Sequence, residues 1–242
     1  MPRANRCIIP GYTYHLTHRC HNRKFLLRCR TDRIEYWHRL RKNVRKYRIS
    51  LFNFCITDNH VHLLGTCRRA EDISRFMQQL EGEFADYYNK RKNRTGSFWG
   101  ERFHCTMIDN HEHLWNCLQY IDLNMVRAGV VAHPGLWPWC GYRELVGERK
   151  RYRLLNTGRL VELLEVKNIE SLAEFHRQRI DEAIKNQCLN REAVWTESIA
   201  VGSKEFLEGI ISVNKRRKKF YISIAKDGTS FIKEDLLKFV YL

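Results

Sequence analysis

The sequence predicts an α+β protein in which helices cover an antiparallel sheet. Short β-prone runs alternate along the chain with longer segments whose apolar residues recur at helical spacing. In the first half of the chain these elements follow the order β-α-β-β-α-β, with one more helix after them. Two of the strands are separated only by the turn signal Asp58-Asn59, so we expect them to pair as an antiparallel hairpin.

The first strand and the first helix are predicted before residue 50. Residues 12–18 alternate in polarity and are β-prone, which indicates a strand. Asp32 is of a type that caps helices, and we expect a helix to begin near it. The residues that recur at helical spacing after Asp32 are Ile34, Trp37, Leu40, Val44 and Tyr47.

The elements that follow complete the pattern. Further strands are predicted over residues 50–57, 61–66 and 102–108, and helices over residues 72–90 and 110–128. Gly129 stands where a glycine commonly ends a helix. This order is the ferredoxin-like split β-α-β arrangement, in which the first and third strands are central.

A Pro- and Trp-rich stretch over residues 133–142 predicts a domain boundary. We expect a first domain over residues 1–147 and an appendix over residues 148–242. The appendix is predicted to be mainly helical, with helices near 171–184, 191–199 and 204–211 and a β-hairpin around Asp227-Gly228. Its role stays open between a structural or dimer-forming addition and a second DNA-binding module.

The chain is strongly basic. Its 242 residues carry a formal net charge of +16, which favours a polyanionic partner, most often nucleic acid. Residues 1–50 hold 14 Lys and Arg against 2 Asp and Glu, so the surplus is concentrated near the N-terminus. The alternative interpretation is a solvated basic face with no partner.

Nine cysteines are present, an odd number, and no Cys-x-x-Cys occurs, which argues against a disulfide framework and a zinc ribbon. The N-terminal residues lack the apolar region of a signal peptide, and no run of 18 apolar residues predicts a membrane span. We therefore expect a protein of the reducing cytoplasm.

The most informative motif is His60-Val61-His62, at the start of the third strand. Side chains on a strand alternate between its faces, so both imidazoles point the same way and can chelate one divalent ion. Imidazoles alone suit zinc, copper or manganese better than magnesium. The alternative is a pair of strand histidines that face solvent or are satisfied in a core.

Tyr120 and Asn124 lie one turn apart on the third predicted helix. With Asn116 and Arg127 they form a polar stripe, so we expect Tyr120 to be available for chemistry and Asn124 to complete a metal site. Arg127 could hold a phosphate through its guanidinium fork. Five other histidines are interpreted as non-ligands: His15, His18, His104, His111 and His113.

A metal pair and a tyrosine together are suited to attack on a phosphodiester. A phosphotyrosine product keeps the energy of the broken bond, so rejoining needs no ATP and strand transfer is favoured over hydrolysis. Phosphate-binding loop, Gly-x-Ser-x-Gly and His-Glu-x-x-His motifs are absent from the sequence, which argues against kinases, hydrolases of that type and metalloproteases.

Four ordered blocks resemble a known family. They are Gly11 to Arg19, Asn59 to Leu64, Gly96 to Phe103 and Tyr120 to Gly129. Over about residues 1–147 the chain resembles the IS200-like single-tyrosine transposases of the HUH superfamily, and among them the REP-associated tyrosine transposases. It departs from the family where Met125 replaces a proline and Cys20 replaces a glycine.

The resemblance implies a ferredoxin-like catalytic domain over residues 1–147 and an enzyme of DNA transposition and recombination. His60, His62 and Asn124 would bind Mg²⁺ or Mn²⁺, and Tyr120 would form a 5′-phosphotyrosine and leave a 3′-hydroxyl. The substrate would be single-stranded DNA beside an imperfect hairpin. The expected DNA-binding residues are Arg3, Arg6, Arg19, Arg23, Lys24, Arg102 and Arg127.

Two other functions are compatible with the same charge. A catalytically silent protein that binds DNA hairpins, such as a domesticated regulator, would need the phosphate contacts without the chemistry. An RNA-binding ferredoxin-like module would need paired aromatic residues on the central strands, and that pattern is absent from the sequence. The sequence leaves open monomer or homodimer, and whether the tyrosine acts in its own subunit or a partner's.

Overall fold

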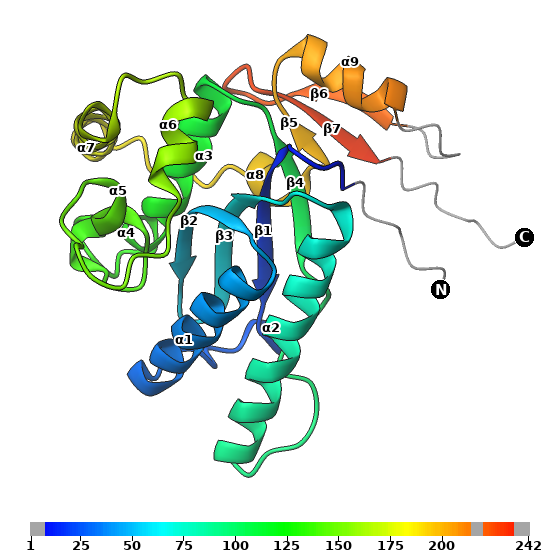
Figure 1. The fold of residues 1–242 in the computed structure, drawn as a ribbon, viewed down its shortest axis with the longest axis vertical. Helices are drawn as coiled ribbons and strands as arrows, with labels where there is room; N and C mark the ends of the chain where they lie inside the picture. Colours follow the sequence, from blue (N-terminus) through cyan, green and yellow to red (C-terminus); the bar gives the residue numbers. More distant parts are fainter. Residues whose placement is uncertain (1–7, 214–219, 235–242) are drawn as a thin grey trace, which may run out of the picture.

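The computed structural model describes residues 8–213 and 220–234, and within them a single mixed sheet organises the fold. The strands are β1 (Thr13–Arg19), β2 (Ser50–Ile56), β3 (His60–Thr66), β4 (His104–Ile108), β5 (Ala200–Val201), β6 (Phe220–Ile224) and β7 (Ser230–Glu234). They lie in the order β2-β3-β1-β4-β5-β7-β6 (Figure 1). All neighbouring pairs are antiparallel except β4 and β5.

The predicted fold class is confirmed. β1 and β3 are the two central strands of the β2-β3-β1-β4 unit, as the split β-α-β order requires. β2 and β3 are joined by a short turn that includes Asp58 and Asn59. The pairing of β1 with β3 places Thr17 opposite His62, which fixes the residues that share a face at the site described below.

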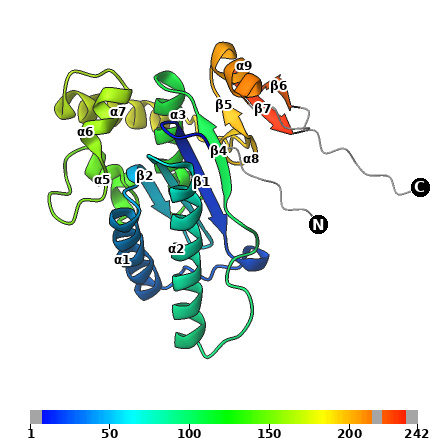
Figure 2. The same ribbon diagram turned by 45° about the vertical axis from the view of Figure 1, so that its right-hand side comes forward.

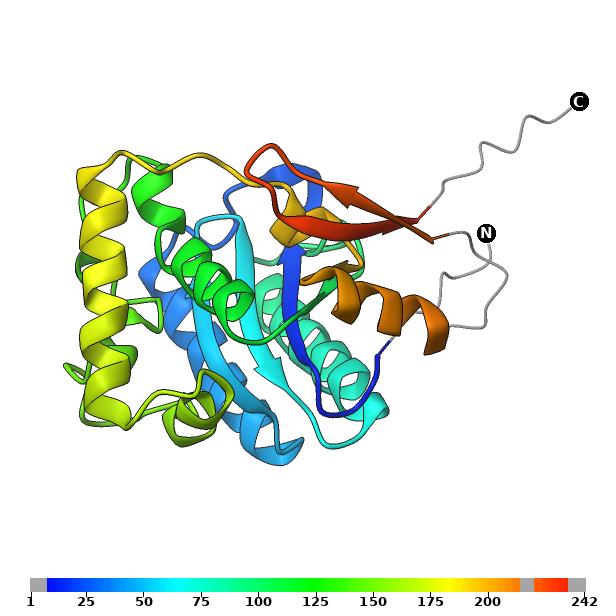
Figure 3. The same ribbon diagram turned by 90° about the horizontal axis from the view of Figure 1, so that it is seen from above.

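Two long helices cover one face of the sheet, α1 (Arg30–Lys46) and α2 (Ala70–Arg91). The face is defined by alternate β1 residues, since His18 contacts Tyr36 on α1 and Glu81 on α2. The opposite face carries α3 (Glu112–Asp122), α4 (Asn124–Arg127) and α8 (Val194–Glu197), as Figure 3 shows for α3. Both faces of the central strands are therefore buried.

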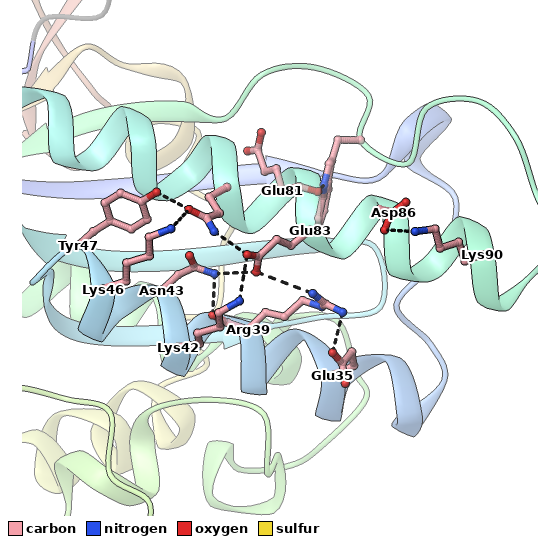
Figure 4. A network of polar contacts seen from close by, with 12 residues as sticks. Glu35, Arg39, Lys42, Asn43, Lys46, Tyr47, Glu81, Glu83, Asp86 and Lys90 are labelled. Carbon is pink, nitrogen blue, oxygen red and sulfur yellow. Dashed lines mark hydrogen bonds and ion pairs between the residues drawn. The ribbon is translucent and has the colours of Figure 1, made fainter.

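Polar contacts join α1 to α2 along their exposed sides (Figure 4). Glu83 on α2 accepts from Lys42 and Asn43, each at 3.2 Å, and Lys46 donates to Gln79 at 2.6 Å. Part of the basic surplus of residues 1–50 is thus matched by acidic and amide groups of α2. For these side chains the solvated-face interpretation fits better than a DNA-binding one.

Several predicted helix boundaries differ from those observed. Cys29, rather than Asp32, is the N-cap residue of α1. Asp32 lies in the first turn of this helix, where its carboxylate forms an ion pair with the Arg91 guanidinium at 2.5 Å. α3 begins at Glu112 because His111 adopts a φ of 55°, which a right-handed helix cannot include. The helix predicted to run through residue 128 is interrupted at Leu123, and Gly129, at φ 66°, ends α4 as predicted.

The region after residue 147 contains further helices and joins the sheet. Its helices are α6 (Thr157–Leu163), α7 (Ile169–Lys185), α8 and α9 (Lys204–Val213); α5 (Tyr142–Leu145) and the 3-10 turns η1 (His21–Arg23) and η2 (Pro134–Leu136) precede it. The predicted hairpin is confirmed as β6–β7. Residues 191–199 form only the short α8, because Ser198 is extended and leads into β5.

The C-terminal strands cover an edge that the split β-α-β unit would leave open. β5 pairs with β4, and β7 pairs with β5, so the sheet continues into this region. Figure 2 shows the hairpin and α9 together at this end of the molecule, with α6 and α7 at the other. In the parts of the chain that the structure describes, no helix combines the length and apolarity needed to cross a membrane.

Candidate active site

The predicted catalytic residues meet on the face of the sheet opposite α1 and α2. β3 supplies His60 and His62, the end of α3 supplies Tyr120, and α4 supplies Asn124 and Arg127. The two histidine rings are 4.8 Å apart between centroids and almost perpendicular. The strand alternation that predicted a shared face for these histidines is therefore seen in the fold.

The Nδ1 atom of His60 is hydrogen-bonded within the turn between β2 and β3. Its Nδ1 lies 2.7 Å from Asn59 Oδ1 and 2.9 Å from Thr57 Oγ1. The Thr57 hydroxyl already donates to the His60 carbonyl, so it accepts from Nδ1. The Nδ1–H tautomer satisfies both contacts, and it leaves the Nε2 lone pair of His60 for a ligand.

His62 is fully enclosed between two polar side chains. Its Nδ1 lies 2.9 Å from Nε2 of His15, and its Nε2 lies 2.9 Å from Nδ2 of Asn124. An amide nitrogen is no metal ligand, so Asn124 would have to turn its side chain to present Oδ1 to a cation. The predicted proximity of His62 and Asn124 is thus observed, with the amide donating to the imidazole.

Burial keeps these imidazoles neutral. It lowers the pKa of His60 to about 3, and the positive charges of Arg19, Arg127 and Arg191 act in the same direction. Burial also lowers the pKa of His62 well below its usual value, with a further contribution from His60. Neutral imidazole is the form that binds a metal ion.

His15 lies in the site beside His62, although sequence reasoning set it aside as a non-ligand. Its ring stacks on that of His62, with centroids 5.0 Å apart, and its Nδ1 lies 2.8 Å from the carbonyl oxygen of Trp195. His15 and His18 face opposite sides of β1, since His15 contacts His62 and His18 contacts Tyr36 on α1. The missing information was the register of β1 against β3, which brings His15 diagonally beside His62.

Tyr120 is buried, with 6% of its surface exposed, rather than lying on an open polar stripe. Its ring meets the ring of His62 edge-on, 6.0 Å between centroids, and lies 6.2 Å from that of Trp195. Burial raises the pKa of the Tyr120 hydroxyl, while the charges of Arg127 and Arg191 oppose that rise. Asn116, predicted on the same stripe, bonds to Arg179 on α7 instead.

The cationic residues fall into two groups. Arg127 is half-buried, with its guanidinium carbon 4.2 Å from the Tyr120 ring centroid, and Arg19 is half-buried at the end of β1. Arg23, Lys24 and Arg102 are exposed. Arg3 and Arg6 lie outside the described residues.

Arg191 is a further cation that sequence reasoning missed. It lies in the C-terminal region, pairs with Glu197 at 3.0 Å, and its charge acts on His60, Tyr120 and Arg127. One arginine among many in a basic chain carries no local signal, and only the fold brings it to Tyr120.

The donor set fits a divalent cation, with two neutral imidazoles and a reorientable amide oxygen. Among the described residues no group of three or more His, Cys, Asp or Glu side chains is arranged to hold a metal ion. The Nε2 atom of a third imidazole, that of His15, faces His62. The groups that could hold a cation here are the Nε2 atoms of His60 and His62 and, after its amide turns, Oδ1 of Asn124.

Comparisons with known proteins agree with this geometry. Residues 9–124 match the family model described as "Transposase IS200 like". A search of curated proteins finds no match. A solved structure of a REP-associated tyrosine transposase bound to a REP hairpin superposes with a TM-score of 0.52 at 22% identity, covering 63% of this chain and 89% of that one, and it shows a shared fold.

A second solved structure, from Deinococcus radiodurans R1 and assigned provisionally as a transposase, has a TM-score of 0.36 at 19% identity. The match covers 48% of this chain and 92% of the other chain. The matched residues 9–124 include His60, His62, Tyr120 and Asn124. Over this segment, which is just under half of the 242 residues, the chain is similar to the IS200-like transposase family.

Proposed function

We propose that this protein is a transposase that cleaves and rejoins single-stranded DNA beside a hairpin, with Tyr120 as the nucleophile. The observation that carries the proposal is the packing of Tyr120 against His62 on one side and beneath the Arg127 guanidinium on another. A buried tyrosine next to two neutral imidazoles and a cation is suited to phosphoryl transfer rather than to simple core packing.

His60, His62 and Asn124 would hold the divalent cation, Mg²⁺ or Mn²⁺. When bound, such an ion polarises the phosphodiester and stabilises the charge that develops on its oxygens. The two imidazoles favour Mn²⁺ over Mg²⁺, whose usual ligands are oxygens.

The transfer step conserves the phosphodiester energy. The Tyr120 oxygen bonds to phosphorus, the bond from phosphorus to the 3′-oxygen breaks, and the 3′-oxygen takes a proton. The products are a 5′-phosphotyrosine and a free 3′-hydroxyl. In the reverse direction a 3′-hydroxyl attacks the phosphotyrosine and restores Tyr120, so the strands are rejoined without an external energy source.

The cations around the site have separate roles in this proposal. Arg127 and Arg191 oppose the burial-driven rise in the Tyr120 pKa and so favour the tyrosinate. Arg19, Arg23, Lys24 and Arg102 would contact the DNA backbone, as would Arg3 and Arg6. The bound REP hairpin of the structural relative supports a hairpin substrate, and a nucleoid location in the cytoplasm would follow from that substrate.

The silent hairpin-binding function is favoured by one observation. Tyr120 is largely covered, and Trp195 and Thr196 from the C-terminal region contribute to that cover. A protein that only binds hairpins would have no need to expose the tyrosine. The RNA-binding alternative loses support, because both faces of β1 and β3 are buried and offer no open stacking platform.

Covalent adduct formation distinguishes these functions. Labelled single-stranded hairpins from the DNA flanking the gene are incubated with Mg²⁺, Mn²⁺ or EDTA, and the protein is examined for an attached label. We expect a metal-dependent adduct with the wild type and none with Tyr120→Phe. The matched control is Tyr142→Phe, which removes another buried hydroxyl and should keep the adduct. Tight hairpin binding with no adduct in either metal would support the silent protein.

A further inference from the structure

We propose that the C-terminal region is a working part of the catalytic site: the carbonyl of Trp195, acting through His15, fixes the tautomer of His62 that leaves Nε2 free for a cation. This inference rests on the proposed function, because it treats His62 as a ligand. His15 is accordingly a positioning residue for the reaction.

The Trp195 carbonyl sets the direction of the hydrogen bonds that run from it through His15 to His62. A backbone carbonyl oxygen can only accept a hydrogen bond, so His15 Nδ1, 2.8 Å from the Trp195 oxygen, must carry the proton. Both residues are fully buried, at 0% and 1% exposure, so water does not compete for this bond. The tautomer of His15 is therefore Nδ1–H.

The next link follows from the neutrality of His15. Its ring contacts the Trp195 carbonyl, His62 and Tyr120, and no carboxylate within the described residues, and it is fully buried, so no neighbouring group stabilises a charged ring. A neutral ring protonated at Nδ1 has a lone pair at Nε2. His62 Nδ1, 2.9 Å away, must then be the donor, and the His62 proton resides on Nδ1.

The contact between His62 and Asn124 agrees with this assignment. His62 Nε2 is left with a lone pair, and the atom that faces it at 2.9 Å is the donor Nδ2 of Asn124. The opposite arrangement would need a protonated His15 in a buried site without a carboxylate, which desolvation strongly disfavours. The same lone pair is the one a cation would use.

The C-terminal segment is held firmly enough to act as a fixed reference. Residue Ser198, three positions after Trp195, accepts hydrogen bonds from Thr106 at 2.8 Å and His104 at 3.0 Å on β4. β5 then pairs with β4 directly. The Trp195 side chain is itself buried, and its Nε1 donates to Glu192.

His60 and His62 therefore differ in where their support comes from. His60 is oriented locally, by Thr57 and Asn59 of the same hairpin. His62 is oriented by a carbonyl more than 130 residues away in the sequence. Partners of this kind commonly change metal affinity by about 10- to 100-fold when they are removed.

The test reads the tautomer directly, without cleavage and without metal. Protein labelled with ¹⁵N-histidine is examined in its metal-free form by long-range ¹H–¹⁵N correlation, with His15→Phe and His62→Gln spectra for assignment. We expect both His15 and His62 to carry their proton on Nδ1. A His62 proton on Nε2 in the wild type would overturn the inference, whatever the variants do.

The second readout is the Kd for Mn²⁺ alone, followed by the electron paramagnetic resonance signal of the free ion. His15→Phe should weaken binding by about 10- to 100-fold. The control is His133→Phe, which removes a partly exposed histidine beside Asp181 and should change the Kd by less than about threefold. Unchanged Mn²⁺ affinity in folded His15→Phe protein would also overturn the inference.

The outcomes separate this inference from the proposed function. Suppose that His62 carries its proton on Nδ1 and His15→Phe binds Mn²⁺ more weakly, but the wild type forms no DNA adduct. This result would support the role of Trp195 and His15 and contradict the cleavage proposal. An adduct in the wild type together with an Nε2–H tautomer of His62 would support cleavage and contradict the proposed role of Trp195 and His15.

Discussion

Arg127 lies with its guanidinium carbon 4.2 Å from the centroid of the Tyr120 ring, while its Nη2 donates to the main-chain carbonyl of Tyr120 at 2.6 Å. The two contacts hold one positive charge against the proposed nucleophile. Arg127 is seven residues after Tyr120, about two helical turns, and its side chain reaches back to Tyr120 across the interruption at Leu123.

This relationship predicts that Arg127→Ala slows adduct formation. Loss of the charge removes a group that favours tyrosinate and could stabilise the phosphoryl group, and we expect the single-turnover rate to fall about 100-fold. Arg179→Ala is the control, because Arg179 also lies over an aromatic ring, that of Phe175, but on α7. Equal rates for wild type and Arg127→Ala would contradict this role for Arg127.

Asn124→Leu tests the third ligand. The substitution keeps a side chain of similar size and removes the oxygen, so the Kd for Mn²⁺ should rise by at least about tenfold. Calorimetric titration with Mn²⁺ measures this directly. Asn116→Leu is the matched control, since Asn116 bonds to Arg179 rather than to His62. If the two variants bound Mn²⁺ equally well, Asn124 would be a hydrogen-bond partner of His62 and no ligand.

The buried pair of Asp122 and His176 predicts a large effect on stability. Their side chains are 0% and 1% exposed, and Oδ2 and Nε2 are 2.7 Å apart. His176→Ala would leave the Asp122 carboxylate buried without this partner, which costs about 3–5 kcal/mol of unfolding free energy. Urea unfolding measures the loss. His133→Ala, which removes a partly exposed histidine beside Asp181, should cost less than about 1 kcal/mol.

Two glycines with open space around them should respond in opposite directions. Gly82 lies within α2, and a methyl group there meets no atom within 4 Å, so Gly82→Ala should stabilise the protein by about 0.5–1 kcal/mol. Gly129 has equal space but a φ of 66°, so Gly129→Ala should destabilise it by about 1 kcal/mol. Thermal unfolding of both variants checks the pair, and shifts of the same sign would contradict the assigned backbone conformations.

The sequence predicted most of the β-α-β-β-α-β unit because its signals are local. Strand alternation placed His60 and His62 on one face, and helical spacing brought Asn124 near Tyr120. The order of the elements then implied central positions for β1 and β3, which the sheet has. These steps need only two periodicities and one topological rule.

The contacts that could not be predicted depend on the register between distant strands and on very short helices and strands. His15 joins His62 only through the pairing of β1 with β3, and neither strand reveals that register by itself. Trp195 lies in a four-residue helix that is followed by a two-residue strand, and Arg191 lies just before that helix. Both elements are too short to leave a periodic signal. The burial of Tyr120 follows from the same segment, so the polar-stripe interpretation of α3 was wrong about its exposure.

The most direct test of the account is peptide mapping of the covalent protein–DNA adduct formed on a labelled single-stranded hairpin with Mn²⁺. The account predicts a single modified peptide that contains Tyr120, joined through a 5′-phosphate, and no adduct in Tyr120→Phe. An adduct of equal yield in Tyr120→Phe, or a modified peptide from elsewhere in the chain, would contradict it.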